Sequence, residues 1–267
     1  MNNMTDSLDY AEIPYLQNIL NYLPIDPIDE EDVNNYIQNI TNLISINYRY
    51  DQYQFAYFGV HLLYMTYIYS TSWKISQINP CRYKDAIVFA RPYSGRDKEL
   101  KIEDADSIFD YSLLPEKDIS RIFKIIDLDK SQISKVCDLV DIRNDMAHAT
   151  GKFEILNEDG FDAKIKNVLM SMNCIHKCMF KQIRAWYSQV LLSFCAGKYG
   201  DEYKDPNDFI AEQLIQSFKL SVNELVVCKE MSISTLATQH RGCEDKLKKF
   251  KKAVEKYCDD MGYSDLA

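Results

Sequence analysis

The sequence predicts an all-α fold, a helical bundle with helical extensions at both ends. Apolar residues recur at three- and four-residue spacing along most of the chain, which is the periodicity of an amphipathic helix. The 267 residues include only 8 Gly and 7 Pro against 19 Tyr and 12 Phe, so the helices should be long and few. With 46% apolar and 27% charged residues, the chain is large enough to bury a core.

Eight helices are expected, each marked by apolar residues at helical spacing and by residues that start or end a helix. Pro24 closes the first, the acidic run 29–32 favours the start of the second, and Gly197 ends the longest. The pattern breaks over 79–116, where we expect a loop or insertion with a small hairpin at 86–89. The expected helices cover residues 16–23, 33–44, 50–73, 118–126, 130–149, 161–196, 205–225 and 244–259.

The chain divides, on this pattern, into a bundle at residues 50–200 and helical extensions at residues 1–49 and 201–267. Within the bundle, the stretch from Gln52 to Trp73 contains no Asp, Glu, Lys or Arg and is long enough to span a bilayer. Its many hydroxyl groups and one imidazole would need partners in lipid. We therefore expect a buried helix of the bundle and no membrane partner.

The formal net charge is −9 at pH 7, which disfavours nucleic-acid binding through the field of the whole molecule. Histone-like proteins and polybasic membrane anchors are excluded, and any contact with a polynucleotide has to be local. Acidic residues occupy the N-terminal region where a secretory signal has basic and apolar ones. We expect a cytoplasmic protein whose eight cysteines are reduced thiols.

Residues 133–152, ISKVCDLVDIRNDMAHATGK, combine an apolar stripe with polar residues beside it. On a helical wheel of about 100° per residue that starts at the first of them, Arg143 falls at about 280°, Asn144 at about 20° and His148 at about 60°. All three lie on or next to the stripe, at the last turns of the helix that Gly151 ends. The stripe comprises Ile133, Val136, Cys137, Val140 and Ala147, and the solvated face comprises Asp138, Asp141 and Asp145.

These three polar residues suit a phosphodiester. Arg143 offers a planar fork of donors to phosphate oxygens, and His148 can exchange a proton near neutral pH. RNA carries its own nucleophile, the 2′-hydroxyl, so an enzyme need only position it, move protons and stabilise a crowded anionic phosphorane. On an RNA substrate this route requires no metal, and we expect no other cofactor.

The segment RNDMAH, residues 143–148, resembles the Arg-x4-His signature of HEPN domains, including the polar residue after the arginine. The resemblance covers roughly residues 50–200. It implies a homodimer in which two copies of the motif face one another across a cleft, and a metal-independent endoribonuclease that leaves a cyclic phosphate. It further implies a role as a toxin or antiphage defence effector, with an antitoxin or regulatory protein as a partner.

Carried over by position, the resemblance gives Arg143 the role of binding and stabilising the scissile phosphate and His148 that of proton transfer, while Asn144 orients one of them or the phosphate. Two alternatives stay open. Arg143 pairs with Asp138, Asp141 or another carboxylate while His148 caps the helix, and nothing is catalysed. Alternatively, the same face serves a non-catalytic interaction or nucleotide-sensing module, as in some HEPN relatives.

Further basic residues are candidates for RNA contact. Lys152 lies just past the motif and is the nearest extra cation in the sequence. Lysines within 246–256 form a basic amphipathic helix, which contacts RNA or an acidic partner or is a solvated face packed along its apolar edge. A basic loop beside a cleft would guide a polyanion onto an acidic protein. The loop cations are Arg91, Arg96, Lys98 and Lys101.

A metal site was also considered at Cys174 and Cys178, which lie one helical turn apart. His176 between them points about 200° away from Cys174 on the helical wheel. Third and fourth ligands are not evident, apart from His240 and Cys243 far along the chain. We expect buried thiols rather than a metal centre.

Overall fold

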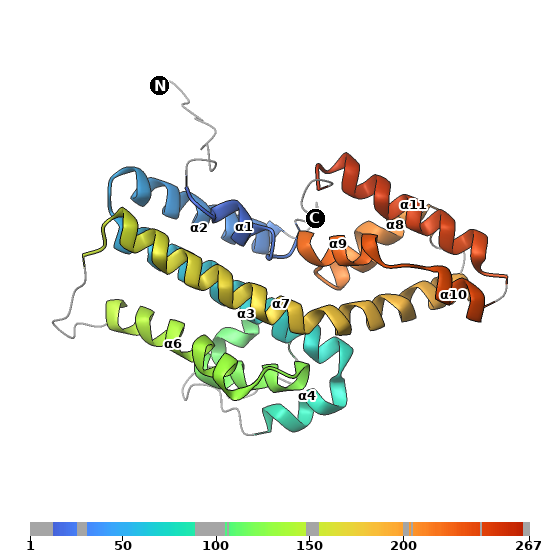
Figure 1. Ribbon diagram of the computed structural model, residues 1–267, viewed down its shortest axis with the longest axis horizontal. Helices are drawn as coiled ribbons and strands as arrows, with labels where there is room; N and C mark the ends of the chain where they lie inside the picture. Colours follow the sequence, from blue (N-terminus) through green and yellow to red (C-terminus); the bar gives the residue numbers. More distant parts are fainter. Residues whose placement is uncertain are drawn as a thin grey trace.

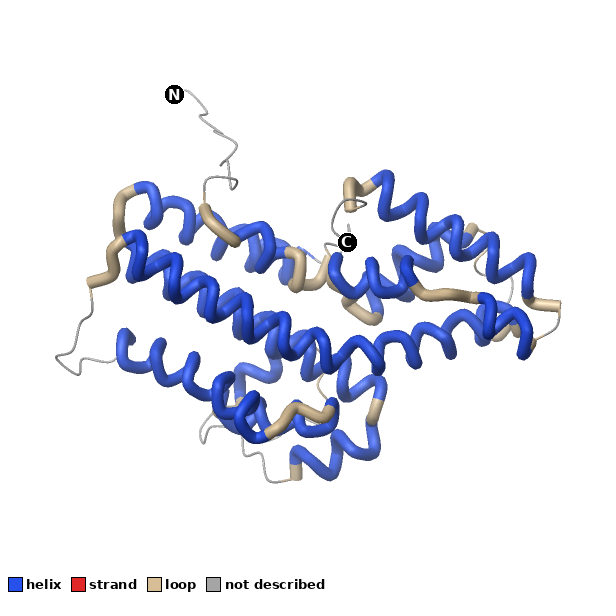
Figure 2. Tube along the Cα trace, in the orientation of Figure 1, coloured by secondary structure: helices blue, strands red, loops and turns tan. Residues whose placement is uncertain are grey.

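The computed structural model describes residues 13–25, 31–88, 105, 107–147, 155–199, 203, 205–240 and 242–263. Within these ranges every regular element is helical, which confirms the all-α class (Figure 2). The elements, in chain order, are α1 (Leu16–Leu20), α2 (Glu31–Arg49), α3 (Tyr53–Ile78), α4 (Pro80–Ile87), the 3-10 helix η3 (Ile108–Leu113), α5 (Glu116–Ile119), the 3-10 helix η4 (Ser120–Ile126), α6 (Lys130–Ala147), α7 (Glu158–Cys195), α8 (Pro206–Phe209), the π-helical segment η5 (Ile210–Ser217), α9 (Val222–Glu230), α10 (Ser234–Gln239) and α11 (Glu244–Asp260).

Helix α7 is the longest element, with 38 residues, and it crosses most of the molecule in Figure 1. Helices α3 and α6 pack along its N-terminal half, and α9 and α11 pack against its C-terminal half (Figure 1). Its first turn is capped by Asn157, whose side chain accepts a hydrogen bond from the Gly160 amide at 2.9 Å. Glu158 and Asp159 add negative charge where the helix dipole is positive. The predicted long helix is thus confirmed.

Helix α3 is buried over most of its length, as the absence of charged residues over 52–73 predicted. Several of its hydroxyl groups have hydrogen-bond partners inside the protein. Thr66 donates to the Leu62 carbonyl at 3.0 Å, and Tyr67 donates to the Met172 carbonyl of α7 at 3.0 Å. None of the helices in the part of the chain that the structure describes combines the length and apolar character needed to cross a bilayer.

The close contact between α2 and α3 depends on Gly59. A Cβ atom at this position would lie 2.6 Å from Cγ1 of Ile44 and 3.0 Å from Cδ2 of Leu43. Real side chains do not approach so closely, so only glycine allows the two helix backbones this separation.

Helix α11 packs along its apolar edge, where Leu247, Phe250 and Val254 are fully buried. The Phe250 ring lies 5.0 Å from the Phe194 ring of α7, measured between centroids. The predicted amphipathic helix is therefore present, and its apolar side belongs to the core. Its exposed lysines include Lys246, Lys248, Lys249, Lys252 and Lys256.

The expectation of an irregular segment at 79–116 is wrong in part, because α4 and η3 lie inside it. Pro80 lies in the segment expected to be irregular, but it occupies the first turn of α4, where the missing amide hydrogen costs nothing. Residues 86 and 87 end that helix and form no hairpin strand. Residues 89–104 and 106 lie outside the described residues.

The helix expected over 205–225 is interrupted. Helix α8 and the π-helical η5 end at Ser217, and α9 begins at Val222. Between them Lys219 has a φ of 57°, a left-handed conformation that a continuous α-helix does not tolerate. The helix expected over 118–126 is likewise split between α5 and η4, and α10 was not predicted.

Candidate functional site

Helix α6 carries the first residues of the RNDMAH segment. Its stripe residues Val136 and Val140 are 2% and 3% exposed, whereas the aspartates predicted for the solvated face are exposed. Arg143 and Asn144, which the wheel places on or beside the stripe, are half-buried. The Arg143 side chain is 21% exposed, and its Nε atom is fully buried.

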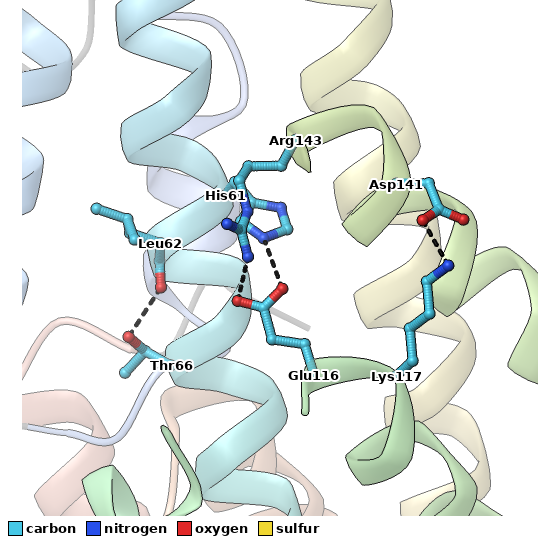
Figure 3. A network of polar contacts seen from close by, with 7 residues as sticks. All are labelled: His61, Leu62, Thr66, Glu116, Lys117, Asp141 and Arg143. Atoms are coloured by element: carbon cyan, nitrogen blue, oxygen red, sulfur yellow. Dashed lines mark hydrogen bonds and ion pairs between the residues drawn. The ribbon is translucent and has the colours of Figure 1, made fainter. Parts of the chain in front are cut away.

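The carboxylate of Glu116 on α5 receives Arg143. The guanidinium Nη2 donates to Glu116 Oε1 in a short, charge-assisted hydrogen bond. The other carboxylate oxygen, Oε2, lies 3.9 Å from Nε2 of His61 on α3. Figure 3 shows the guanidinium and the imidazole converging on this one carboxylate. Three helices, α3, α5 and α6, thus supply one residue each to the cluster.

His61 is fully buried. In the part of the chain that the structure describes, neither of its ring nitrogens has a hydrogen-bond partner, and neither has Nε of Arg143. Buried polar atoms without partners are costly and therefore uncommon. The distance of 3.9 Å between His61 Nε2 and Glu116 Oε2 is too long for a hydrogen bond but short enough for an electrostatic interaction.

The electrostatics of the cluster follow from these positions. Burial lowers the pKa of His61, and the Arg143 charge lowers it further, while Glu116 opposes both effects. For Glu116, burial raises the pKa, but the nearby His61 ring and the Arg143 guanidinium together lower it by more, so the net shift is downward. The cluster at neutral pH is therefore an ionised carboxylate between a cation and a neutral imidazole.

A second ion pair joins α5 to α6 beside the first (Figure 3). Lys117 Nζ lies 2.5 Å from Asp141 Oδ1, with side chains that are 48% and 52% exposed. Consecutive residues of α5, Glu116 and Lys117, thus bind two residues of α6. Because the Lys117 pair is solvated, it contributes little to stability. It joins the same two helices as the Arg143 pair but is more exposed.

Several predicted site residues are placed by these observations. Arg143 and Asn144 lie on α6 as expected. His148 and Lys152 lie outside the described residues, as do the loop cations Arg91, Arg96, Lys98 and Lys101. The alternative in which Arg143 pairs with a carboxylate is correct as to the ion pair: the partner is Glu116, while Asp141 binds Lys117.

His61 and Glu116 were not predicted as site residues. One signal was present in the sequence, since His61 is one of only four histidines and lies in a stretch without charged residues. The sequence gave no such signal for Glu116, because this residue is 27 positions from Arg143 and the contact is made by tertiary packing.

An apolar groove lies between α6 and α7 on the side of α6 that carries Ile142. It has a cavity volume of about 470 Å³ and includes Met170, a large apolar side chain that is 69% exposed. Exposed apolar surface of this kind is typical of contact surfaces. The groove is lined by Leu128, Gln132, Lys135, Val136, Asp138, Leu139, Ile142, Asn167, Met170, Ser171, Cys174 and Ile175.

The cysteines considered for metal binding have other surroundings. Cys174 accepts a hydrogen bond from Nε2 of Gln132 at 3.2 Å, and the His176 ring packs edge-on against Tyr22 with centroids 5.5 Å apart. Among the described residues, no group of three or more His, Cys, Asp and Glu side chains gathers in the way that a metal ion requires.

Comparisons with known proteins add no family to this geometry. Neither a family model, nor a curated protein, nor a solved structure matches the chain. A function for this chain is therefore inferred from residues 143–148 and from the contacts of Arg143.

Proposed function

We propose that this protein is a metal-independent endoribonuclease of the HEPN type, acting in the cytoplasm as a toxin or antiphage defence effector. The observation that carries the proposal is the position of Arg143. It begins the RNDMAH segment, lies near the end of a helix in an all-α bundle, and presents a half-buried guanidinium that a carboxylate from another helix holds in place. A fixed, partly desolvated cation is what phosphate binding needs.

In this proposal each residue has one task. Arg143 binds the non-bridging oxygens of the scissile phosphate, Asn144 orients the phosphate or a neighbouring side chain, and His148 transfers protons. Lys152 contributes to RNA binding. The 2′-oxygen forms a bond to phosphorus while the bond from phosphorus to the 5′-oxygen breaks. One proton leaves the 2′-hydroxyl and one reaches the departing oxygen, so the products are a 2′,3′-cyclic phosphate and a 5′-hydroxyl.

The proposal includes a homodimer in which two copies of the motif form a composite site. An acidic protein gains little from its overall field when it binds RNA, so a composite site would bring two Arg143 guanidinium groups to one phosphate-binding cleft. An antitoxin or regulatory protein that covers this cleft would keep the enzyme inactive.

The test is cleavage of end-labelled RNA in excess EDTA. We expect wild-type protein to leave fragments with 2′,3′-cyclic phosphate ends, and Arg143→Ala and His148→Ala each to abolish cleavage while the circular dichroism spectrum is unchanged. Lys117→Ala is the matched control, because it removes a cation between the same two helices without touching the motif. Cleavage by His148→Ala at the wild-type rate, or fragments with 3′-hydroxyl ends, would contradict the mechanism.

A second candidate is a non-catalytic interaction or nucleotide-sensing module. Two observations favour it: Glu116 neutralises the Arg143 charge, and the groove between α6 and α7 exposes Met170. In this case folded wild-type protein leaves RNA intact. The substitution Met170→Glu then disrupts assembly, as measured by sedimentation, whereas Arg143→Ala removes no activity.

A further inference from the structure

Phosphate binding would leave the cluster of His61, Glu116 and Arg143 with an excess of negative charge. Glu116 already neutralises Arg143, yet a phosphate that binds the same guanidinium brings another negative charge within a few ångströms of that carboxylate. Two anions so close in a partly buried site repel each other strongly. Phosphate binding at Arg143 therefore requires that Glu116 gain a new counter-charge.

His61 is placed to supply that charge. Its Nε2 faces Glu116 Oε2 at 3.9 Å, so a side-chain movement of about 1 Å would give a hydrogen bond of ordinary length. Both ring nitrogens are buried without a hydrogen-bond partner among the described residues. An imidazole that takes up a proton there would become the cation that Glu116 loses when phosphate occupies Arg143.

We propose that His61 and Glu116 are positioning residues for Arg143 that act as a proton-coupled latch: when the phosphate of a single-stranded RNA binds Arg143, Glu116 turns to His61 and His61 takes up one proton. This inference rests on the proposed function for its choice of ligand. It adds two residues from α3 and α5 to a site that sequence reasoning placed on α6 alone, and it makes anion binding dependent on pH.

The direction of the pH dependence follows from the groups around the ring. Two charged groups act on His61: Glu116 from α5 and Arg143 from α6. Tyr64 on α3 itself packs beside it with ring centroids 6.1 Å apart. In the free protein burial and Arg143 keep the imidazole neutral. In the bound state an unshared Glu116 favours the protonated ring, so affinity should increase as the pH falls, by about tenfold per pH unit between the two pKa values.

The experiment measures binding rather than cleavage. The probe is a 2′-O-methylated single-stranded RNA, which lacks the nucleophile and survives in the presence of the enzyme. All proteins carry His148→Ala, so that proton uptake cannot come from the imidazole of the motif. Calorimetry in two buffers of different ionisation enthalpy then gives the number of protons that the protein takes up on binding.

We expect this reference protein to take up about one proton on binding at neutral pH. Adding His61→Gln should abolish the uptake and flatten the pH profile. Adding Glu116→Gln should also abolish it and tighten binding about tenfold at pH 8, because the guanidinium is no longer neutralised. Asp141→Asn is the matched control: it breaks the neighbouring α5–α6 ion pair and should leave uptake and affinity unchanged.

His61 is fully buried, so its replacement can disturb folding; Glu116 has a side chain that is 20% exposed and provides the second, safer variant. Unchanged proton uptake in the His61→Gln protein, or weaker binding by Glu116→Gln, overturns the latch. If wild-type protein cleaves RNA but its proton uptake does not depend on His61, the latch is overturned and the proposed ribonuclease activity is supported. Uptake that depends on His61, together with intact RNA in the cleavage test, supports the latch and rejects the ribonuclease.

Discussion

Lys74 of α3 and Glu224 of α9 form an ion pair in which the side chains are 0% and 4% exposed. Glu224 also accepts a hydrogen bond from the Ser221 amide at 2.8 Å, as part of the capping box that begins α9. One carboxylate thus caps a helix and neutralises a buried ammonium. The pair joins the C-terminal helices to the most buried helix of the bundle.

Breaking this pair should be strongly destabilising. Lys74→Met leaves a buried carboxylate without its cation, and we expect the free energy of unfolding to fall by about 3–5 kcal/mol. Urea denaturation measures this fall in the free energy of unfolding. Adding Glu224→Gln to Lys74→Met should recover part of the loss, since the amide keeps the cap and carries no charge. Glu244→Ala, which breaks the exposed pair with Lys248, is the control and should leave stability unchanged; an equal loss there would contradict the role of burial.

Gly59→Ala should separate α2 from α3. The added methyl would lie 2.6 Å from Cγ1 of Ile44, and overpacking of this kind costs about 1–3 kcal/mol. Ile44→Ala removes the clashing atom, so the double variant should be more stable than the sum of the single losses predicts. Strictly additive losses in thermal or urea denaturation would show that space at Gly59 is not the constraint.

Stability should depend on pH through His61. The folded state keeps this imidazole neutral because its pKa is lowered from 6.5, chiefly by burial, whereas the unfolded chain binds a proton below about pH 6.5. The unfolded state therefore binds more protons, and the free energy of unfolding falls as the pH drops below that value. His61→Gln should flatten this part of the curve measured by urea denaturation, and an unchanged slope would rule His61 out as its source.

The two faces of α11 should respond differently to substitution. Phe250 is fully buried and contacts the Phe194 ring, so Phe250→Ala should cost about 3–5 kcal/mol. Lys249→Gln and Lys252→Gln alter exposed side chains and should leave the midpoint of urea denaturation unchanged. If the lysines contact RNA, these same variants reduce the salt dependence of RNA binding. A large loss of stability in the lysine variants would contradict the observed packing.

Most of the helices could be predicted from the sequence because helix periodicity is a local property. The absence of charges over 52–73 identified α3 as buried, and the apolar stripe of 133–147 placed Arg143 between core and solvent. Short helices were harder: α4 was missed because Pro80 has opposite meanings inside a helix and at its first turn. Interruptions such as Lys219 leave the apolar spacing nearly unchanged, so the pattern over 205–225 looked continuous.

The site was predictable only where its residues are close in sequence. Arg143 and Asn144 were found because they lie within one helix. Glu116 contacts Arg143 from a second helix, and His61 lies near Glu116 on a third. Apolar periodicity does not indicate which carboxylate the folded chain brings to a given arginine. The sequence leaves the ionic partner of Arg143 open among two aspartates and an unspecified carboxylate, and the structure identifies it as Glu116.

Because α7 is one continuous helix, it links the unfolding of the two ends of the molecule. At about 1.5 Å per residue, its 38 residues have a length of about 57 Å along the helix axis, and its two halves carry different neighbours (Figure 1). Its middle turns cannot lose their amide hydrogen bonds unless both sets of neighbours come away. In deuterium exchange those amides should report the rarest, most global opening of the molecule, while the turns near Glu158 and Cys195 exchange through local fraying.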